Sequence, residues 1–334
     1  MPLALDLLRK LQEQTPQEAW DTIFAHAWGL CAGALDQDTA VAQVTKRDRE
    51  LGALDLFLST AGWDLWTVYE ASIPRTSREL AGWWAAQPDG KAVLILDALS
   101  LRELPWLLQG AQDNGYTIHQ AKPTGAEIPA DTTPFAKALG FAQRSVLANN
   151  GAGGAHKLPG ATTDCVDVPW ADCVGLIGSQ KNWVLWHQWP DHRLHYLDDA
   201  GKGLDAITKE AAERLSDEAF WKLIGRLTTG RRLIITADHG YAATGHFPDT
   251  SNKDHADYLK NLFKSGRWAP ADGSEGGWVP PIDLVLDTDH GSNRFVLGRR
   301  KWRAQGGYPT LAHGGLTVLE VIVPFIELSR SQGV

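Results

Sequence analysis

Apolar residues recur at helical spacing through roughly the first 85 residues of the chain. Leu3, Leu7, Leu8 and Leu11, for example, fall on one stripe of an amphipathic helix. A turn signal, QPDGK at 87–91, ends this part of the chain. We therefore predict an N-terminal helical region over residues 1–88, followed by a domain of a different kind.

Beyond this turn, short apolar runs alternate with helical patterns. The predicted strands are 92–99, 116–122, 172–178, 182–189, 233–238, 282–287 and 293–302. The predicted helices pass through 104–108, begin near Pro134 and run from about 205 to 227, while the closing segment 317–328 suits either a helix or a strand. Such alternation indicates an α/β core over 89–334, with a mostly parallel sheet covered by helices on both faces.

Two segments interrupt the alternation. Residues from about 245 to 281, with Asp254, His255 and a GSEGG turn, are predicted to be an insertion into the core. This insertion could be a lid over a substrate or a surface excursion. The segment GAGGAHKLPG at 151–160 is predicted to be a flexible loop that could cover a site. It lacks the spacing of a nucleotide-binding P-loop.

Composition limits the class of protein. The chain has 334 residues, of which 43% are hydrophobic and 22% charged, as in a soluble globular protein with one large domain and an accessory part. A formal charge of −8 disfavours broad electrostatic binding to nucleic acid, although a local basic channel is possible. No uncharged apolar run is long enough to span a bilayer, and charges interrupt the apolar N-terminus. We expect a soluble protein with no membrane partner.

The cysteines and tryptophans are expected to be packing residues. Cys31, Cys165 and Cys173 show no CxxC spacing, and an odd number of cysteines fits no disulfide framework. Reduced cysteines favour a cytoplasmic location. The 15 tryptophans could stack on bases, but no basic residues alternate with them, so packing within the core is the favoured interpretation.

Acidic side chains follow two of the predicted strands at the point where each apolar run stops. Asp97 ends LILD, and Asp238 ends IITAD with His239 directly after it. An Asp in such a place can simply cap the next helix. However, ligands gather at the carboxyl ends of parallel strands, and two such Asp residues with a His favour a metal site there. Carboxylate and imidazole ligands suit zinc, manganese or iron.

Other candidates are weaker on their own. His313 precedes a Gly-Gly turn in TLAHGGLTVLEVIVPF, where a histidine is more often a loop residue than a ligand. The segment TDHGSNR repeats the Asp-His-Gly triplet at Asp289 and His290, which we predict to lie in a loop with a possible substrate contact. Arg294 is a candidate phosphate clamp, because a guanidinium can bind phosphate through two parallel hydrogen bonds.

The combination of LILDAL, TADHGY and AHGGLTVLEVIVPF resembles the PglZ domain, a branch of the alkaline phosphatase superfamily. The resemblance covers about residues 90–328. It implies an α/β sheet that holds two divalent metals, usually zinc, at its carboxyl edge, and transfer of phosphoryl or sulfuryl groups through a Ser or Thr nucleophile. By this resemblance, Asp97, Asp238 and His239 hold one metal, and His313 helps to hold the other.

The nucleophile is expected at a helix start downstream of Asp97, and IPADTTPFAKAL at 128–139 fits this description. A Thr-x-Pro arrangement resembles the nucleophile step of related phosphodiesterases, which favours Thr132 over Thr133. Thr132 would then also contact the metal. The alternative is that both threonines only cap the helix. Ser100 ranks below Thr132, because it lies a few residues into the next element.

The superfamily also leads us to expect a second Asp with a His a few residues later. Asp198, in LHYLDDAGKGLD, has the right context, but Lys202 stands where the His is expected. His192 or His195, both upstream, could substitute, or they could be ordinary polar residues near a strand end. The sequence therefore matches the superfamily pattern less completely at the second metal site than at the first.

These features predict a metal-dependent phosphoester hydrolase, more specifically a phosphodiesterase with a threonine nucleophile. The cofactors would be two divalent ions, zinc or alternatively manganese. By resemblance, substrates would be nucleotide-containing diesters, including cyclic oligonucleotides or nucleic acid ends, and partner proteins would belong to phage-defence systems. The negative charge disfavours long duplex DNA. The alternative is a non-catalytic PglZ-fold scaffold. A sulfatase is set aside, because the modified Cys or Ser motif of that class is absent from the sequence.

Overall fold

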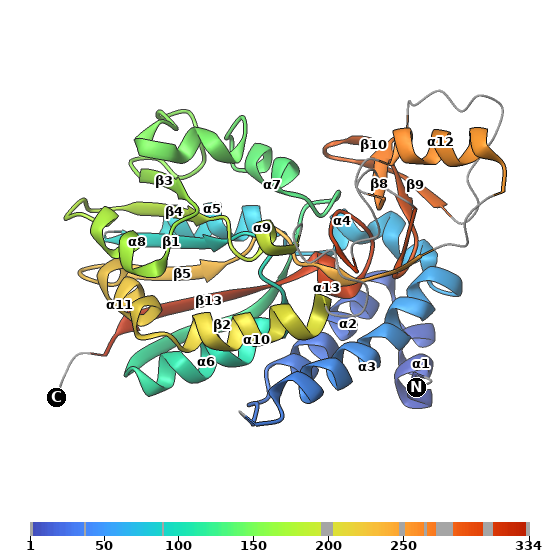
Figure 1. Ribbon diagram of the computed structural model, residues 1–334, viewed down its shortest axis with the longest axis horizontal. Helices are drawn as coiled ribbons and strands as arrows, with labels where there is room; N and C mark the ends of the chain where they lie inside the picture. Colours follow the sequence, from blue (N-terminus) through green and yellow to red (C-terminus); the bar gives the residue numbers. More distant parts are fainter. Residues whose placement is uncertain are drawn as a thin grey trace.

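A six-stranded sheet forms the centre of the computed structural model (Figure 1), which describes residues 3–36, 38–88, 90–194, 203–246, 251–263, 266–271, 283–302 and 310–331. Its strand order is β2-β13-β5-β1-β4-β3. The strands are β1 (Lys91–Leu96), β2 (Tyr116–Gly125), β3 (Thr162–Val166), β4 (Trp183–His187), β5 (Arg232–Thr236) and β13 (Ile322–Arg330). Only β13 runs against its neighbours β2 and β5, while β1, β3, β4 and β5 pair in parallel. The predicted α/β class and mostly parallel sheet are confirmed.

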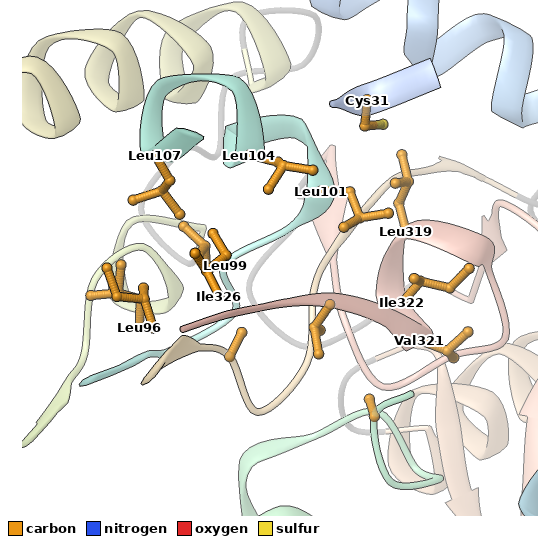
Figure 2. Packing of buried hydrophobic residues seen from close by; sticks show 14 of the residues in the cluster. Cys31, Leu96, Leu99, Leu101, Leu104, Leu107, Leu319, Val321, Ile322 and Ile326 are labelled. Carbon is orange, nitrogen blue, oxygen red and sulfur yellow. The ribbon is translucent and has the colours of Figure 1, made fainter. Parts of the chain in front are cut away.

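The central strand β1 is apolar on both sides because helices cover both faces of the sheet. Val93 and Ile95 pack with α5 (Thr76–Ala86) and α7 (Thr132–Ala138) on one face. Leu94 and Leu96 point to the opposite face, since side chains alternate along a strand. This second face is covered by α6 (Leu104–Asp113), α10 (Gly203–Ser216) and α11 (Glu218–Leu227). Figure 2 shows part of this cluster, in which Leu104 and Leu107 of α6 are labelled together with Leu96, Leu99 and Ile326.

The N-terminal region is helical, and its buried apolar side chains belong to the same cluster as those on the second face of the sheet. Its helices are α1 (Leu5–Glu13), α2 (Pro16–Cys31), α3 (Ala40–Thr60), the 3-10 helix η1 (Trp63–Val68) and α4 (Tyr69–Ser72). Trp20, Trp66 and Tyr69 pack edge to face or tilted, with ring centroids 4.9–5.8 Å apart. The Tyr69 hydroxyl lies 3.1 Å from the backbone oxygens of Ala126, which follows β2, and Val321, which precedes β13, so it connects this region to the ends of both strands. These tryptophans are core residues, as predicted from the sequence.

A smaller unit stands beside the main sheet. It contains a three-stranded sheet in the order β8-β10-β9, formed by β8 (Trp268–Pro270), β9 (Asp283–Thr288) and β10 (Gly291–Val296). Helix α12 (Lys253–Leu262) packs on it: Leu259 of the helix and Phe263, the residue after it, share a hydrophobic cluster with Val296 and Trp302. The described residues of the segment expected to be an insertion, 245–281, therefore share a core with residues that follow it. Figure 1 places α12 and these strands to one side of the main sheet.

Short elements complete the described chain. They are the 3-10 helices η2 (Leu101–Glu103) and η3 (Arg144–Asn150), the helices α8 (Trp170–Leu176), α9 (Asp191–Leu194) and α13 (Val318–Val321), and the strands β6 (Ala242–Ala243), β7 (Gly245–His246), β11 (Arg300–Lys301) and β12 (Leu311–Ala312). No helix in the described ranges is both long and apolar enough to cross a membrane.

Three predicted elements differ from the structure. Residues 172–178 were predicted as a strand, but 170–176 form helix α8, in which Trp170 and Cys173 lie three residues apart and are both buried. The edge strand is instead β3, which the pattern missed because TTDCV is largely polar. The helix over 205–227 is divided, because the Asp217 carboxylate accepts a hydrogen bond from the Ala219 N–H at 2.8 Å and caps a new helix, α11. The closing segment forms both a helical turn and a strand.

Candidate active site

Asp97 occupies the centre of the candidate site. It directly follows β1, and its side chain is fully buried. Its Oδ2 accepts hydrogen bonds from the Trp186 indole, at 2.8 Å, and from the guanidinium of Arg144. Burial raises the pKa of Asp97 well above its ordinary value, and the nearby carboxylates of Asp238 and Asp191 raise it further. A carboxylate in this position needs a positive charge beside it.

Asp238 and His239 follow β5 and face Asp97. The Asp238 Oδ1 accepts the Ala98 N–H at 3.0 Å, whereas its Oδ2 accepts no hydrogen bond from any described residue. Burial raises the pKa of Asp238 to about 6. The His239 Nδ1 lies 2.9 Å from the Gly240 carbonyl and must carry the proton, since a carbonyl only accepts. The lone pair of Nε2 is left to face Asp238 Oδ2, at 3.4 Å, and Asp97 Oδ1, at 3.7 Å.

Thr132 brings a hydroxyl to the same place. It is the first residue of α7, and its Oγ1 lies 3.3 Å from Asp97 Oδ1 and 3.4 Å from His239 Nε2. The N-cap of this helix is Asp131, which makes no side-chain capping hydrogen bond, and the Thr132 hydroxyl is directed to Asp97 and His239. Thr133 lines a neighbouring pocket instead. Of the two candidate nucleophiles, Thr132 is therefore the one that contacts Asp97 and His239.

A second group of donors lies on the other side of His239. The imidazole rings of His239 and His313 are stacked, with centroids 4.4 Å apart. His313 Nε2 lies 3.3 Å from Asp191 Oδ1. Two sets of possible metal ligands result, Asp97-Asp238-His239 and Asp191-His239-His313, and within each set the ligand atoms lie within 4.8 Å of one another. The structure thus brings together four predicted ligands, Asp97, Asp238, His239 and His313.

Asp191 was missed in the sequence, where Asp198 was the expected second acid. Asp191 begins α9, four residues after β4 ends, and the chain folds back so that its N–H donates to the Asp97 carbonyl at 3.0 Å. The rule that selected Asp97 and Asp238, an acid after a buried strand, would have found it if a short loop had been allowed. Asp198, together with His195 and Lys202, lies outside the described residues. His192 is described and lies against Asp167, with 3.3 Å between Nδ1 and Oδ1.

Arg144 was also missed. It comes from η3, a loop-like segment with no sequence pattern that marks a site, and its Nη1 is 3.8 Å from Asp191 Oδ2 as well as bonded to Asp97. Arg294, the expected phosphate clamp, lies in β10 of the small sheet with its Nη1 3.0 Å from Asp283 Oδ2. His290 likewise lies near another acid, with its Nε2 3.2 Å from Glu127 Oε2.

The two donor groups fit divalent cations. The carboxylates of Asp97, Asp191 and Asp238 lie close together beneath the surface, where bound protons or a bound cation would offset their mutual repulsion. The buried Asp238 Oδ2 faces the group without a hydrogen-bond donor, as expected for an atom that ligates an ion. Oxygen and imidazole donors in threes suit zinc or manganese, with positions left open for a substrate.

No family model matches the chain. Over 106 residues, or 30% of the chain, it is 27% identical to the alkaline phosphatase-like protein PglZ of Bacillus cereus (strain H3081.97). The resemblance to the PglZ domain is confirmed as a sequence similarity. The match spans only 12% of that protein.

The solved structures to which this chain has some overall similarity include murine ectonucleotide pyrophosphatase/phosphodiesterase 5. An inactive variant of it in complex with AMP has a TM-score of 0.48 and 12% identity, covering 72% of this chain and 87% of that chain. The murine protein without that change has a TM-score of 0.47 and 13% identity, covering 72% and 88%. The human counterpart has a TM-score of 0.44 and 13% identity, covering 72% and 87%.

Proposed function

We propose that this protein is a metal-dependent phosphodiesterase that uses Thr132 as its nucleophile. The observation that carries the proposal is the position of the Thr132 hydroxyl, 3.3 Å from Asp97 Oδ1 and 3.4 Å from His239 Nε2. Both partners belong to a group of three possible metal ligands. A hydroxyl that touches a cation site is placed to be activated as a nucleophile.

The metal ligands in this proposal are Asp97, Asp238 and His239 for one ion, and Asp191, His313 and the shared His239 for a second. Thr132 would contact the first ion. A bound divalent cation would stabilise the alkoxide of Thr132 and the charge on the phosphate oxygens. We choose zinc as the first metal to test and manganese as the second, since both accept oxygen and imidazole donors. Asp198 is included as a further ligand, and only the resemblance to the superfamily supports it.

The reaction would proceed in two displacements. The Thr132 Oγ1 forms a bond to phosphorus while the bond from phosphorus to the leaving oxygen breaks, and the departing alkoxide takes up a proton. Water then attacks the phosphothreonine, which releases the phosphomonoester and restores the hydroxyl. Arg144 lies between Asp97 and Asp191 with its side chain 24% exposed, so its guanidinium can turn from these carboxylates toward a phosphate oxygen.

The substrate class follows the PglZ resemblance: nucleotide-containing diesters, in a cytoplasmic phage-defence setting with partner proteins of that system. The negative net charge supports short substrates over long duplex DNA. Arg294 lies in β10, outside both groups of possible metal ligands, and would contact substrate only if its pairing with Asp283 is exchanged for a phosphate.

The deciding experiment measures metal content and hydrolysis on the same preparation. Purified protein is loaded with Zn²⁺ or Mn²⁺, dialysed and analysed for metal, then assayed with bis(p-nitrophenyl) phosphate and with p-nitrophenyl phosphate. We expect bound metal and faster hydrolysis of the diester, with loss of turnover in Thr132→Ala. Protein that binds no transition metal and hydrolyses neither ester would instead support the scaffold alternative.

A further inference from the structure

A pocket of about 570 Å³ lies close to Thr132, because the next two residues of α7, Thr133 and Pro134, line it. Helix α7 contributes Thr133 and Lys137 to its lining, and α5 contributes Arg78. Lys157 comes from the loop at 151–160, and the small sheet adds Trp268 along with Asp289, His290 and Asn293. None of the two groups of possible metal ligands lines it. The proposed reaction at Thr132 does not itself use this pocket.

Trp268, one of the lining residues, is linked to the candidate active site through Asp131. The Trp268 indole N–H donates to Asp131 Oδ2 at 3.1 Å, and this oxygen lies 4.0 Å from His313 Nδ1. The indole also lies against Gly314, where an added Cβ would meet Trp268 Cδ1 at 2.5 Å. Because Thr133 directly follows Thr132 and lines the pocket, a substrate with its phosphorus at Thr132 would have the pocket close by.

Basic side chains outnumber acidic side chains among the residues that line the pocket. Arg75 is buried and pairs with Glu127 at 2.9 Å, with Asp289 at 2.5 Å and, outside the lining, with Glu70 at 3.1 Å, while Arg78 lies 3.2 Å from the same Asp289 oxygen. The two acids of the lining are thus already neutralised by arginine. Lys137 and Lys157 are exposed, and neither has an acidic partner among the described residues. The pocket is locally positive in a chain with a net charge of −8.

The floor of the pocket is held in place by hydrogen bonds. The buried Glu127 carboxylate accepts the hydroxyl of Ser77 and the Arg75 guanidinium, and it lies 3.2 Å from His290 Nε2. A floor fixed in this way costs little to organise when a ligand binds. Lys137 and Lys157 supply positive charge to the pocket, and the indole of Trp268 supplies a flat apolar surface.

We propose that this pocket binds a second phosphate of the substrate, one that lies beyond the diester undergoing cleavage. Lys137 and Lys157 would contact this phosphate as point charges. The proposal rests on the proposed function, because Thr132 is what places the reacting phosphorus. It narrows the substrate class to diesters with an additional phosphate, such as a short oligonucleotide with a phosphorylated end.

A kinetic test compares two substrates that differ only in this group, a thymidine dinucleotide with and without a 5′-phosphate. In wild-type protein we expect kcat/KM to be about tenfold higher for the phosphorylated dinucleotide, the equivalent of one charge-assisted contact. The double variant Lys137→Gln/Lys157→Gln should bring the ratio near one. Lys222→Gln is the matched control, since Lys222 is an exposed lysine on α11 that pairs with Glu218, and it should leave the ratio unchanged.

A binding test separates failure of this proposal from failure of the proposed function. The full chain, freed of metal with a chelator, is titrated calorimetrically with both dinucleotides. Tighter binding of the phosphorylated dinucleotide, lost in the double lysine variant, supports the pocket even if no diester is hydrolysed. Equal affinities of wild-type protein for the two dinucleotides would overturn the pocket assignment, even if the diesterase activity is found.

Discussion

The imidazoles of His239 and His313 are stacked, with ring centroids 4.4 Å apart and planes inclined by 21°. The two residues come from separate His-Gly turns, one after β5 and the other before α13. His239 belongs to both groups of possible metal ligands, whereas His313 belongs to one. Loss of His239 should therefore disturb both groups, and loss of any other ligand should disturb one.

Metal analysis tests this difference. After loading with Zn²⁺ and dialysis, His239→Ala should retain almost no metal, whereas Asp191→Asn and Asp238→Asn should each retain the ion held by the other group. Each affected site should weaken by at least about 100-fold, because changes to residues that merely orient a ligand already cost 10–100-fold. The measurement is metal content by mass spectrometry.

His192→Ala serves as the control for this series. His192 stands next to Asp191 in sequence, but its Nδ1 lies 3.3 Å from Asp167 and outside both groups. Its substitution should leave metal content at the wild-type level. Normal metal content in His239→Ala would contradict the assignment of the site.

Thr132→Ala should bind metal normally and lose several orders of magnitude in turnover of the diester. The reason is that no other hydroxyl lies within 3.5 Å of both Asp97 and His239 among the described residues. Thr132→Ser should keep part of the activity, because it retains the attacking oxygen. Thr133→Ala is the neighbouring comparison. If both alanine variants turn over the diester at the wild-type rate, a water molecule attacks and the covalent mechanism is wrong.

The part of the site that could be predicted from sequence is the part that follows strand geometry. Ile95 pairs with Thr236 across β1 and β5, two residues before Asp97 and Asp238, so an acid at the end of each strand meets the other. His313 needed the family resemblance, because a His before two glycines has no meaning by itself. Arg144 could not be predicted, since it reaches the site from an irregular segment whose path depends on tertiary packing.

The elements of the fold also divide into those that could be predicted from sequence and those that could not. Strands β1, β4 and β5 are buried on both faces, so their apolar runs were visible in the sequence. Strand β3 is at the edge and has only Thr163 fully buried, which left no apolar run to detect. The helix α8 was mistaken for a strand because a segment of seven residues is too short for its periodicity to be distinguished from a strand.

Arg144→Met should destabilise the metal-free protein more than the metal-loaded protein. In the absence of an ion, Arg144 is the cation bonded to the buried Asp97 carboxylate. Its removal leaves that charge without a partner and should cost about 1–3 kcal/mol, less than a fully buried pair because the guanidinium is partly exposed. A bound ion would supply the missing charge. Thermal unfolding with and without Zn²⁺ measures the difference, and an equal loss in both states would show that Arg144 and the ion do not act on the same carboxylate.

His187 should make the native protein sensitive to acid. Its Nε2–H donates to the Val168 carbonyl at 2.9 Å, and its Nδ1 accepts the Trp189 N–H at 3.0 Å, so the neutral ring uses both nitrogens. Burial lowers the pKa of His187 to about 4. In the unfolded chain the ring binds a proton near pH 6.5, well before the native ring does. Stability is therefore fully present above pH 6.5 and falls as the pH drops toward 4, by about 3 kcal/mol in all.

The test compares wild-type protein with His187→Gln in urea at several pH values between 7 and 4. Because Gln does not titrate, the free energy of unfolding of the variant should fall less steeply with acid. Asp97 and Asp238 have raised pKa values and therefore change stability in the opposite direction, since the native state binds their protons first. The difference between the two proteins removes these shared contributions and isolates the histidine. If the two curves stay parallel from pH 7 to pH 4, His187 does not remain neutral in the native state, and its hydrogen bonds to Val168 and Trp189 are not the ones that hold it.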